Sequence, residues 1–339
     1  MEDTHKIMLM VALSSSTFAL FITVTLICIC RRTWCSRNES WDEESSFEVA
    51  EMEMMKEEEL IRFEGGEDLT CFDVLDAPGE VIGKSSYGTL YRANLIRSNT
   101  FVVLRFLRPA CTGKVQDVMH AVQLLGSVRH PNLVPLCGFY VGTRGEKLLV
   151  HPFYRRGNLA EFIRDGNSEF QKWSVILRIS TGIARGLNHL HTSLQEPIIH
   201  GNLKSKNILL GRNHMPFVSD FGLYMLLNPS TIQEMIEDAA VEGYKPPELI
   251  KTNDTSVETD IFNFGVILLE LLTGKEANQK PSPKQDCRSN SILDHRIFGP
   301  VHEEDILKLY HLAIACCSPL PSFRPDIKHI CKKLQEIGS

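Results

Sequence analysis

The longest uncharged stretch of the chain, Ile7–Cys30, consists mainly of apolar residues. At about 1.5 Å per residue, a helix of this length spans the ~30 Å hydrocarbon core of a bilayer. Basic side chains follow it directly, at Arg31, Arg32 and Arg37. Because cytoplasmic flanks carry such charges, the pattern predicts a transmembrane helix over residues 7–30, with residues 1–6 outside the cytosol. The alternative is a cleaved signal peptide, but the run is long for one and its leading region is not basic.

The charge changes abruptly in the next segment, residues 31–69. From Asp42 to Asp68 the chain carries twelve carboxylates against two basic side chains, a balance of −10, whereas the whole chain has a net charge of −6. Acidic runs of this kind are typical of solvated spacers. An anionic inner leaflet repels such a segment, so we expect it to hold the following domain away from the membrane.

Beyond residue 70 the apolar pattern is that of a folded domain. Phe101–Leu107 is an apolar, β-branched run that predicts a strand. Val175–His191 repeats apolar residues at helical spacing and predicts a buried helix. The chain has 339 residues, 43% hydrophobic and 23% charged, which is ordinary for a globular protein with a large core.

Composition excludes several classes of protein. The net negative charge, without a basic stretch interleaved with aromatic residues, argues against a nucleic-acid binder. Ten cysteines without a C-x-x-C pair indicate neither a disulfide framework nor a zinc site. They fit a reducing, cytosolic environment.

The most specific motif is the run His200–Leu210, H-G-N-L-K-S-K-N-I-L-L, followed thirteen residues after Asn207 by Asp220-Phe221-Gly222. This combination resembles the catalytic loop H-R-D-L-K-x-x-N and the D-F-G of protein kinases. The resemblance implies that Asn207 and Asp220 would hold magnesium and that Lys204 belongs to the catalytic loop.

Asn202 departs from this pattern, because it stands where a kinase has its catalytic aspartate. That aspartate accepts the hydroxyl proton of the substrate. A neutral carboxamide has no basic oxygen for this step. The main question is therefore whether the domain performs chemistry at all.

The nucleotide-binding motifs are also altered. Val81–Ala93 resembles the glycine-rich loop G-x-G-x-x-G-x-V, with Gly83 and Gly88 in place but Ser85 at the middle glycine. A Cβ at that position should weaken the phosphate cradle without closing it. Val102-Val103-Leu104-Arg105 aligns with V-A-I-K, so Arg105 replaces the lysine that pairs with the phosphates, a change that is not conservative.

The resemblance places helix C at Val115–Val128, with Ala121 at the position of its glutamate. The lysine–glutamate ion pair of an active kinase is thus missing on both sides. Leu148–Tyr154 resembles the strand that enters the hinge. There the carbonyl of Pro152 and the N–H of Tyr154 remain able to contact an adenine.

Other matches concern the stability of the helical lobe. Asp260, in the helix Val257–Leu272, would brace the catalytic loop, and Arg324 would pair with Glu248. Val241 stands where the family often has a threonine that bonds the loop. The resemblance therefore implies that Lys204 has lost its partners.

Residues 70–338 thus resemble the kinase domain of plant receptor-like kinases of the leucine-rich-repeat type. The amino-acid sequences of these motifs are most similar to those of the transmembrane kinase-like pseudokinase subgroup, which lacks a repeat ectodomain. The implied fold is α+β and bilobal, with a small β-rich N-lobe (70–150) and a larger helical C-lobe (151–339) behind one N-terminal transmembrane helix.

These observations predict a catalytically inactive receptor-like kinase, anchored in the plasma membrane with its kinase-like domain in the cytosol. We expect it to act as a signalling interaction module whose partners are other receptor-like kinases or signalling proteins. ATP and magnesium should bind weakly or not at all. Two alternatives remain, a weak or unconventional ATP-dependent serine/threonine kinase and a nucleotide-sensing switch.

Overall fold

The computed structural model describes residues 59–166, 172–250, 254–278 and 303–338. The transmembrane helix expected over residues 7–30 and most of the acidic segment lie outside these residues. Within the described ranges, no helix combines the length and the apolar character that a membrane crossing requires.

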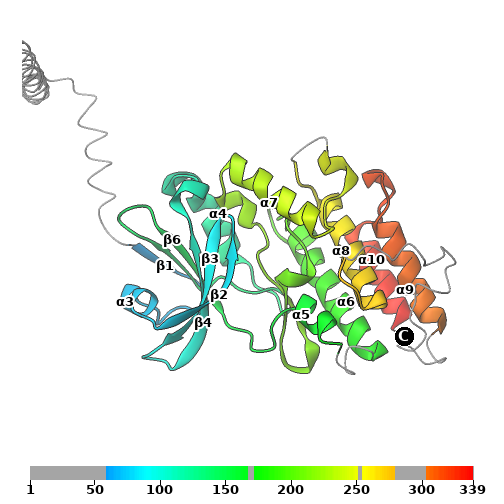
Figure 1. Cartoon of the computed structure of the whole chain (residues 1–339), viewed down its shortest axis with the longest axis horizontal. Coiled ribbons are helices and arrows are strands. Elements are labelled where there is room, and N and C mark those ends of the chain that lie inside the picture. The colour runs from blue at the N-terminus through cyan, green and yellow to red at the C-terminus, as the bar shows by residue number, and fades with distance from the viewer. Residues whose placement is uncertain (1–58, 167–171, 251–253, 279–302, 339) are drawn as a thin grey trace, which may run out of the picture. The chain divides into compact units, whose positions relative to one another are not determined.

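The small lobe is a six-stranded antiparallel sheet in the order β1-β5-β6-β4-β3-β2. It is accompanied by the short helix α3 and the longer helix α4 (Figure 1). The strands are β1 (Glu59–Arg62), β2 (Gly79–Ser85), β3 (Gly88–Leu95), β4 (Thr100–Leu107), β5 (Gly138–Val141) and β6 (Lys147–Pro152), and the helices are α3 (Cys71–Leu75) and α4 (Val115–Ser127).

The two faces of this sheet are buried in two different clusters, as the alternation of side chains along β4 requires. Val102 and Leu104 pack in one cluster with Val74 of α3. Leu107 packs in the other with Val122 of α4, and this second cluster continues into the helical lobe. The predicted strand Phe101–Leu107 and the predicted helix Val115–Val128 are therefore present, and together they form the centre of the lobe.

The sheet includes a strand upstream of residue 70, where the sequence predicts the domain to begin. β1 pairs with β5, and its Leu60 is buried opposite Tyr140. The sequence does not predict this short strand, because the many carboxylates around it give the segment the charge balance of a solvated spacer. The acidic segment thus ends in structure that belongs to the small lobe.

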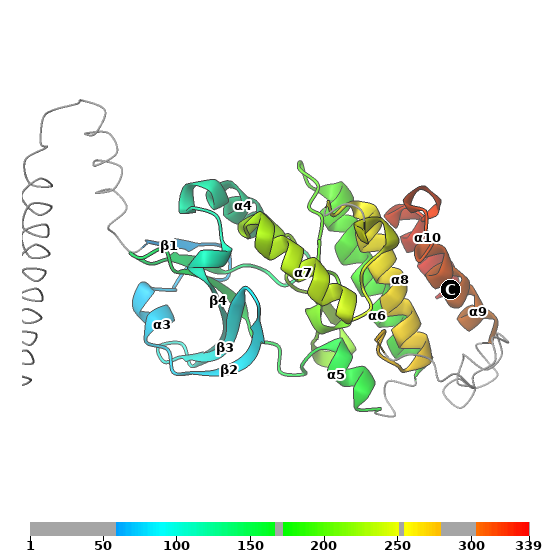
Figure 2. The ribbon, with the colours of Figure 1, turned by 45° about the horizontal axis from the view of Figure 1, so that its top comes forward.

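The larger lobe is helical, with α6 and α8 at its centre and α9 and α10 packed against them (Figure 2). Its elements are α5 (Leu159–Arg164), α6 (Trp173–Asn188), α7 (Pro229–Val241), α8 (Val257–Thr273), α9 (Glu303–Cys316), α10 (Ile327–Ile337) and the hairpin β7 (Ile208–Leu210) and β8 (Pro216–Val218). Helix α8 begins at a capping box of Ser256 and Thr259 and ends at Gly274, whose φ of 65° is the left-handed geometry that glycine adopts without strain.

Two predicted contacts that hold this lobe together are confirmed. Asp260 of α8 accepts hydrogen bonds from the backbone N–H groups of His200 and Gly201, at 2.7 and 3.0 Å. Arg324 donates to both carboxylate oxygens of Glu248, at 2.6 and 2.7 Å. The arginine is buried, so the pair acts within the core of the lobe.

Candidate functional site

A cavity of about 460 Å³ lies between the β2–β3 hairpin and the loop that follows His200. It collects residues from six separate parts of the chain: the glycine-rich hairpin, β4, α5 with its N-cap, the catalytic-loop region, Asp220 and the segment around α7. Its lining includes Gly83, Ser85, Arg105, Asn202, Lys204, Asn207, Asp220, Met235, Asp238, Val241 and Glu242.

Arg105 and Asp220 form a buried ion pair inside this cavity. One guanidinium nitrogen, Nη2, donates to the two carboxylate oxygens of Asp220 at 2.6 and 2.5 Å. Only 6% of the arginine side chain and 12% of the aspartate side chain are exposed. Burial by itself disfavours the charged guanidinium, but the Asp220 carboxylate outweighs it and raises the pKa of Arg105.

This pair gives Arg105 a charged partner that the sequence does not predict. The position of the helix-C glutamate is Ala121, which is buried on α4 and offers no charge. The arginine instead pairs with a carboxylate 115 positions further along the chain. The cation that was predicted to face the phosphates and the carboxylate that was predicted to face magnesium therefore neutralise each other.

The two predicted magnesium ligands do not fit a divalent cation in this arrangement. Both oxygens of Asp220 already accept from Arg105, and a metal beside that guanidinium would meet a like charge. The side-chain amide of Asn207 donates to the backbone oxygen of Asn202 at 2.9 Å. Asp220 has a φ of 62°, a left-handed conformation that short polar residues tolerate.

The catalytic-loop residues line the cavity but provide no base. Asn202 is buried, and within the described structure its side-chain oxygen has no hydrogen-bond partner. Burial lowers the pKa of His200, although the carboxylates of Asp260 and Asp220 oppose this effect. Asn202 has no basic oxygen, and His200 is buried and absent from the lining that the described residues form, so neither side chain is placed to accept the proton of a hydroxyl substrate.

Lys204 has a partner, contrary to the expectation from the motif. Its Nζ lies 3.1 Å from one oxygen of Glu242, and the Nζ of Lys206 lies 3.1 Å from the other. Glu242 follows α7 directly, so the end of this helix is attached to the catalytic loop. Val241, at the position of the threonine, is exposed.

Helix α7 itself is not predicted from the sequence. Figure 2 shows it running from the neighbourhood of α4 toward α8. Asn228 caps it by accepting from the N–H of Thr231, and Pro229 occupies its first turn. This Asn-Pro start, followed by an apolar side at Ile232, Met235 and Ile236, is a recognisable helix signal.

Contacts to the small lobe fix α7 across the entrance of the cavity. Asn228 donates through its backbone to the carbonyl of Cys111 at 2.9 Å and through its side chain to that of Ala110 at 2.8 Å. Near the other end, the Ser86 hydroxyl of the glycine-rich hairpin lies 3.4 Å from an oxygen of Asp238. Met235 and Asp238 of this helix line the same cavity as Asn202.

The sequence-predicted adenine contacts lie apart from this cavity. Of the predicted cofactor residues, Gly83, Ser85 and Arg105 line it, whereas Gly88, Pro152 and Tyr154 are absent from the lining that the described residues form. Pro152 pairs with β4 opposite Val102, and the Tyr154 ring lies 4.4 Å from that of Phe217. Burial raises the pKa of Tyr154 to about 12.

Gly88 has a packing role. It lies opposite Leu107 in the sheet, and a Cβ at this position would approach the Phe106 carbonyl oxygen to 2.4 Å. The glycine is thus required for the close pairing of β3 with β4, whether or not a nucleotide is bound.

Comparison with known proteins agrees with this architecture. The profile of the protein tyrosine and serine/threonine kinase family matches residues 77–334. The kinase-like protein TMKL1 of Arabidopsis thaliana is 35% identical over 323 residues, which cover 88% of this chain and 46% of that protein. The chain spans about half the length, or less, of the curated relatives it matches.

Two solved structures share the fold. The kinase domain of maize SIRK1, bound to AMP-PNP, superposes with a TM-score of 0.73 at 29% identity, over 83% of this chain and 100% of that one. The pseudokinase domain of BIR2, an immune regulator of the RLK/Pelle family, superposes with a TM-score of 0.69 at 28% identity, over 85% and 92% of the two chains. The chain belongs to the protein tyrosine and serine/threonine kinase family, and its folded part is a kinase domain of the plant receptor-like type.

Proposed function

We propose that this protein is a membrane-anchored pseudokinase that works as an interaction module in signalling and does not transfer phosphate. The observation that carries the proposal is the ion pair between Arg105 and Asp220. Phosphoryl transfer depends on cations that are free to face the phosphates and on carboxylates that are free to hold magnesium. Here the two groups bind each other.

Two further observations support the absence of catalysis. Asn202 supplies no general base. The loss of a general base alone lowers the rate on the order of 10²–10⁴-fold. Helix α7 lies across the cavity and is attached to both lobes, through Asn228 and Glu242. Defects in the base, in the phosphate contacts and in substrate access coincide in one site.

Nucleotide binding, if it occurs, should be weak and should not require magnesium. The SIRK1 kinase domain was solved with AMP-PNP. This chain differs from an active kinase in having Ser85 in its glycine-rich hairpin, and Arg105 binds both carboxylate oxygens of its Asp220. One observation favours the nucleotide-sensing alternative: a cavity of about 460 Å³ remains, and its lining includes Asn202, whose buried side-chain oxygen has no partner among the described groups. A thermal-shift experiment with ATP, with and without magnesium, separates these alternatives.

The location and the partners belong to the same proposal. The apolar run Ile7–Cys30 and the arginines that follow it support a single membrane crossing with the kinase-like domain in the cytosol at the plasma membrane. Partners would be other receptor-like kinases or signalling proteins. BIR2, whose pseudokinase domain shares this fold, is an immune regulator, which supports a regulatory role without catalysis.

The deciding experiment is phosphate incorporation into a generic protein substrate by the full-length chain in lipid nanodiscs, with an active receptor-like kinase as positive control. We expect no incorporation above that of Asp220→Ala. Robust activity that Asp220→Ala abolishes would refute the proposal and favour the unconventional kinase.

A further inference from the structure

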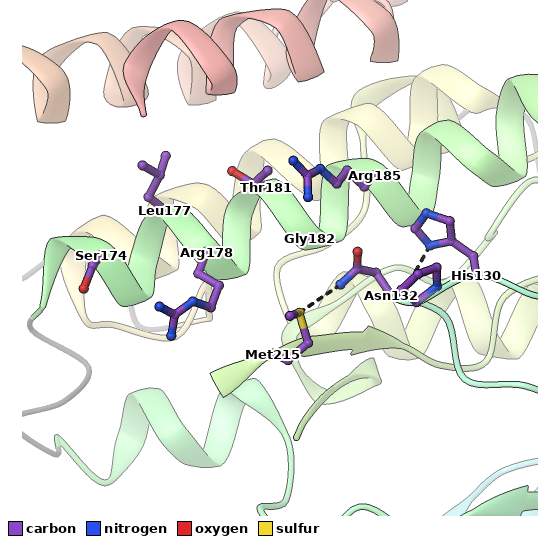
Figure 3. A pocket seen from close by; sticks show the side chains of 10 residues that line it. His130, Asn132, Ser174, Leu177, Arg178, Thr181, Gly182, Arg185 and Met215 are labelled. Carbon is purple, nitrogen blue, oxygen red and sulfur yellow. Dashed lines mark hydrogen bonds between the residues drawn. The ribbon is translucent and has the colours of Figure 1, made fainter. Parts of the chain in front are cut away.

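A groove runs along the exposed side of α6, between this helix and the turn that joins β7 to β8. Figure 3 shows Ser174, Arg178 and Arg185 spaced along α6, with Met215 on a segment beside it. Two adjoining hollows, of about 560 and 780 Å³, share Ser174, Arg178 and Met215 in their linings. We call this surface the α6 groove.

The α6 groove is basic, although the chain as a whole is acidic. Neither hollow has an aspartate or a glutamate in the lining formed by the described residues, and Arg156, Arg178, Arg185 and Arg212 all contribute to it. All four arginines are exposed. Within the described ranges none of them forms an ion pair, so no described carboxylate neutralises their charges.

Contacts to the turn orient two of these guanidinium groups without neutralising them. Arg178 donates through Nη1 to the carbonyl oxygen of Asn213 at 2.7 Å. The Nη1 of Arg156 lies 3.3 Å from Nε2 of His214. A charge that is already held in place loses less conformational entropy when it binds a partner.

Apolar side chains lie among the charges, together with polar ones such as Thr181 and Asn132. Pro131, Leu177 and Met215 line the first hollow next to Arg178 and Arg185. Leu177 and Arg185 are eight residues apart on the helix, a distance of about 12 Å along its axis. The groove therefore offers an apolar floor with cations at intervals that several consecutive residues of an extended peptide can follow.

We propose that the α6 groove docks an acidic peptide segment of a partner protein. An apolar side chain of the peptide would pack on Leu177 and Met215, and its carboxylates would approach Arg178, Arg185 and Arg212. Charge complementarity favours this occupant, and the concave floor favours a narrow chain over a flat lipid surface. The groove lies on α6 and shares no lining residue with the cavity around Arg105, so the proposal is independent of whether that cavity binds nucleotide.

The test measures binding of a fluorescent peptide of alternating glutamate and leucine to the full-length chain in nanodiscs of neutral lipid. A control peptide carries glutamine in place of glutamate. We expect the acidic peptide to bind more weakly as salt rises, and the neutral peptide to bind far less. Arg178→Glu combined with Arg212→Glu should weaken binding roughly tenfold or more, the scale of two exposed charge contacts reversed in sign.

The matched control is Lys114→Glu combined with Lys275→Glu, two exposed cations outside the groove. This pair should change the affinity by less than about twofold, since neither lysine lines the groove and exposed charges that do not contact the peptide are screened by salt. Equal weakening by both charge-reversed pairs would overturn the proposal, because it would show a response to net charge alone.

Two further measurements keep the result interpretable. Arg178→Gln with Arg212→Gln tests the same contacts if the charge-reversed protein melts at a lower temperature. Met215→Ser should reduce the affinity while leaving its salt dependence unchanged, as expected of an apolar anchor. Groove-dependent binding of anionic vesicles without binding of the peptide would also overturn the proposal, in favour of a lipid contact.

Discussion

Arg105 and Asp220 lie on different lobes, and the guanidinium of the first binds both carboxylate oxygens of the second. Arg105 belongs to β4, and Asp220 follows β8. The pair therefore joins the sheet to the helical lobe at the centre of the cavity. It ties the two lobes together and also removes two charges from any role in phosphate or metal binding.

The first prediction concerns the stability that depends on this pair. Asp220→Asn should lower the free energy of unfolding by roughly 3–5 kcal/mol, because it leaves a buried guanidinium without its counter-charge. Adding Arg105→Met should recover much of that loss, since no uncompensated charge then remains. Urea denaturation of the single and double variants measures both effects. Additive losses in the double variant would show that the two side chains do not act as a pair.

The second prediction concerns nucleotide. Calorimetry should give a dissociation constant for ATP no tighter than about 0.1 mM, equivalent to roughly −5.5 kcal/mol. Magnesium should not improve it, because both oxygens of Asp220 accept from Arg105. The SIRK1 kinase domain is a suitable positive control, since it was solved with AMP-PNP. Micromolar binding that requires magnesium would contradict the observed pairing.

The third prediction concerns the missing base. Asn202→Asp alone should not restore phosphate incorporation, because Arg105 would still bind Asp220 and α7 would still cross the cavity. Defects within one catalytic unit are strongly non-additive, so repair of a single member recovers little. The triple variant Asn202→Asp, Arg105→Lys, Ala121→Glu is the comparison, and its rate should exceed that of the single variant but stay low, because Ser85 and α7 are unchanged. An active single variant would show that the base is the only defect.

The fourth prediction concerns the lower lobe. Arg324→Ala should cost roughly 3–5 kcal/mol, because the arginine is buried beside Glu248. Arg144→Ala is the matched control, since that arginine pairs with Glu146 but is 87% exposed, and its loss should cost no more than about 1 kcal/mol. Thermal and urea unfolding of the two variants make the comparison.

The same pair predicts a pH dependence. Partial burial favours protonation of Glu248, but the hydrogen bonds from Arg324 outweigh it and hold the pKa of this carboxyl below its ordinary value of 4.5. A lowered folded-state pKa contributes stability above pH 4.5 that is lost as the pH falls through the folded-state value. The stability difference between the wild type and Glu248→Gln should therefore shrink on acidification below pH 4.5. A difference that stays constant between pH 7 and pH 3 would rule out this linkage.

The fifth prediction concerns topology. A tag placed before Ile7 should be accessible on intact cells, and a tag after Ser339 should be protected until the membrane is permeabilised. Replacing Arg31, Arg32 and Arg37 with glutamine should reduce this preference, because these charges would form the cytosolic flank of the predicted crossing. A soluble, secreted product would contradict the predicted crossing.

Elements with a strong local pattern are predicted well from the sequence. Helix α6 follows from apolar residues at helical spacing, and its observed bounds lie within a few residues of the predicted ones. The contacts of Asp260 and of Arg324 follow from the resemblance to kinase motifs, and the structure confirms both. In each case a single sequence motif, or a single hydrophobic periodicity, is enough to predict the feature.

The partners of Arg105 and Lys204 are not predicted, because they depend on tertiary structure. The motif implies that both cations have lost their partners, but it does not reveal which carboxylates take their place. Asp220 is 115 positions from Arg105, and Glu242 approaches Lys204 only because α7 has formed. A substitution that removes one partner of an ion pair leaves the other charge unpaired. The fold then determines which group pairs with that charge.

Helix α7 is fastened at its start to the loop before α4 and at its end to Lys204 and Lys206. We expect a domain held in this way to present the same surface whether or not a small molecule is present. We expect the strength of its signal to follow the number of copies at the membrane, and the time course of the response to follow synthesis and degradation of the protein. If the proposed function holds, such a component would set the level of the signal through its abundance, which a cell adjusts over hours by expression and not within seconds by catalysis.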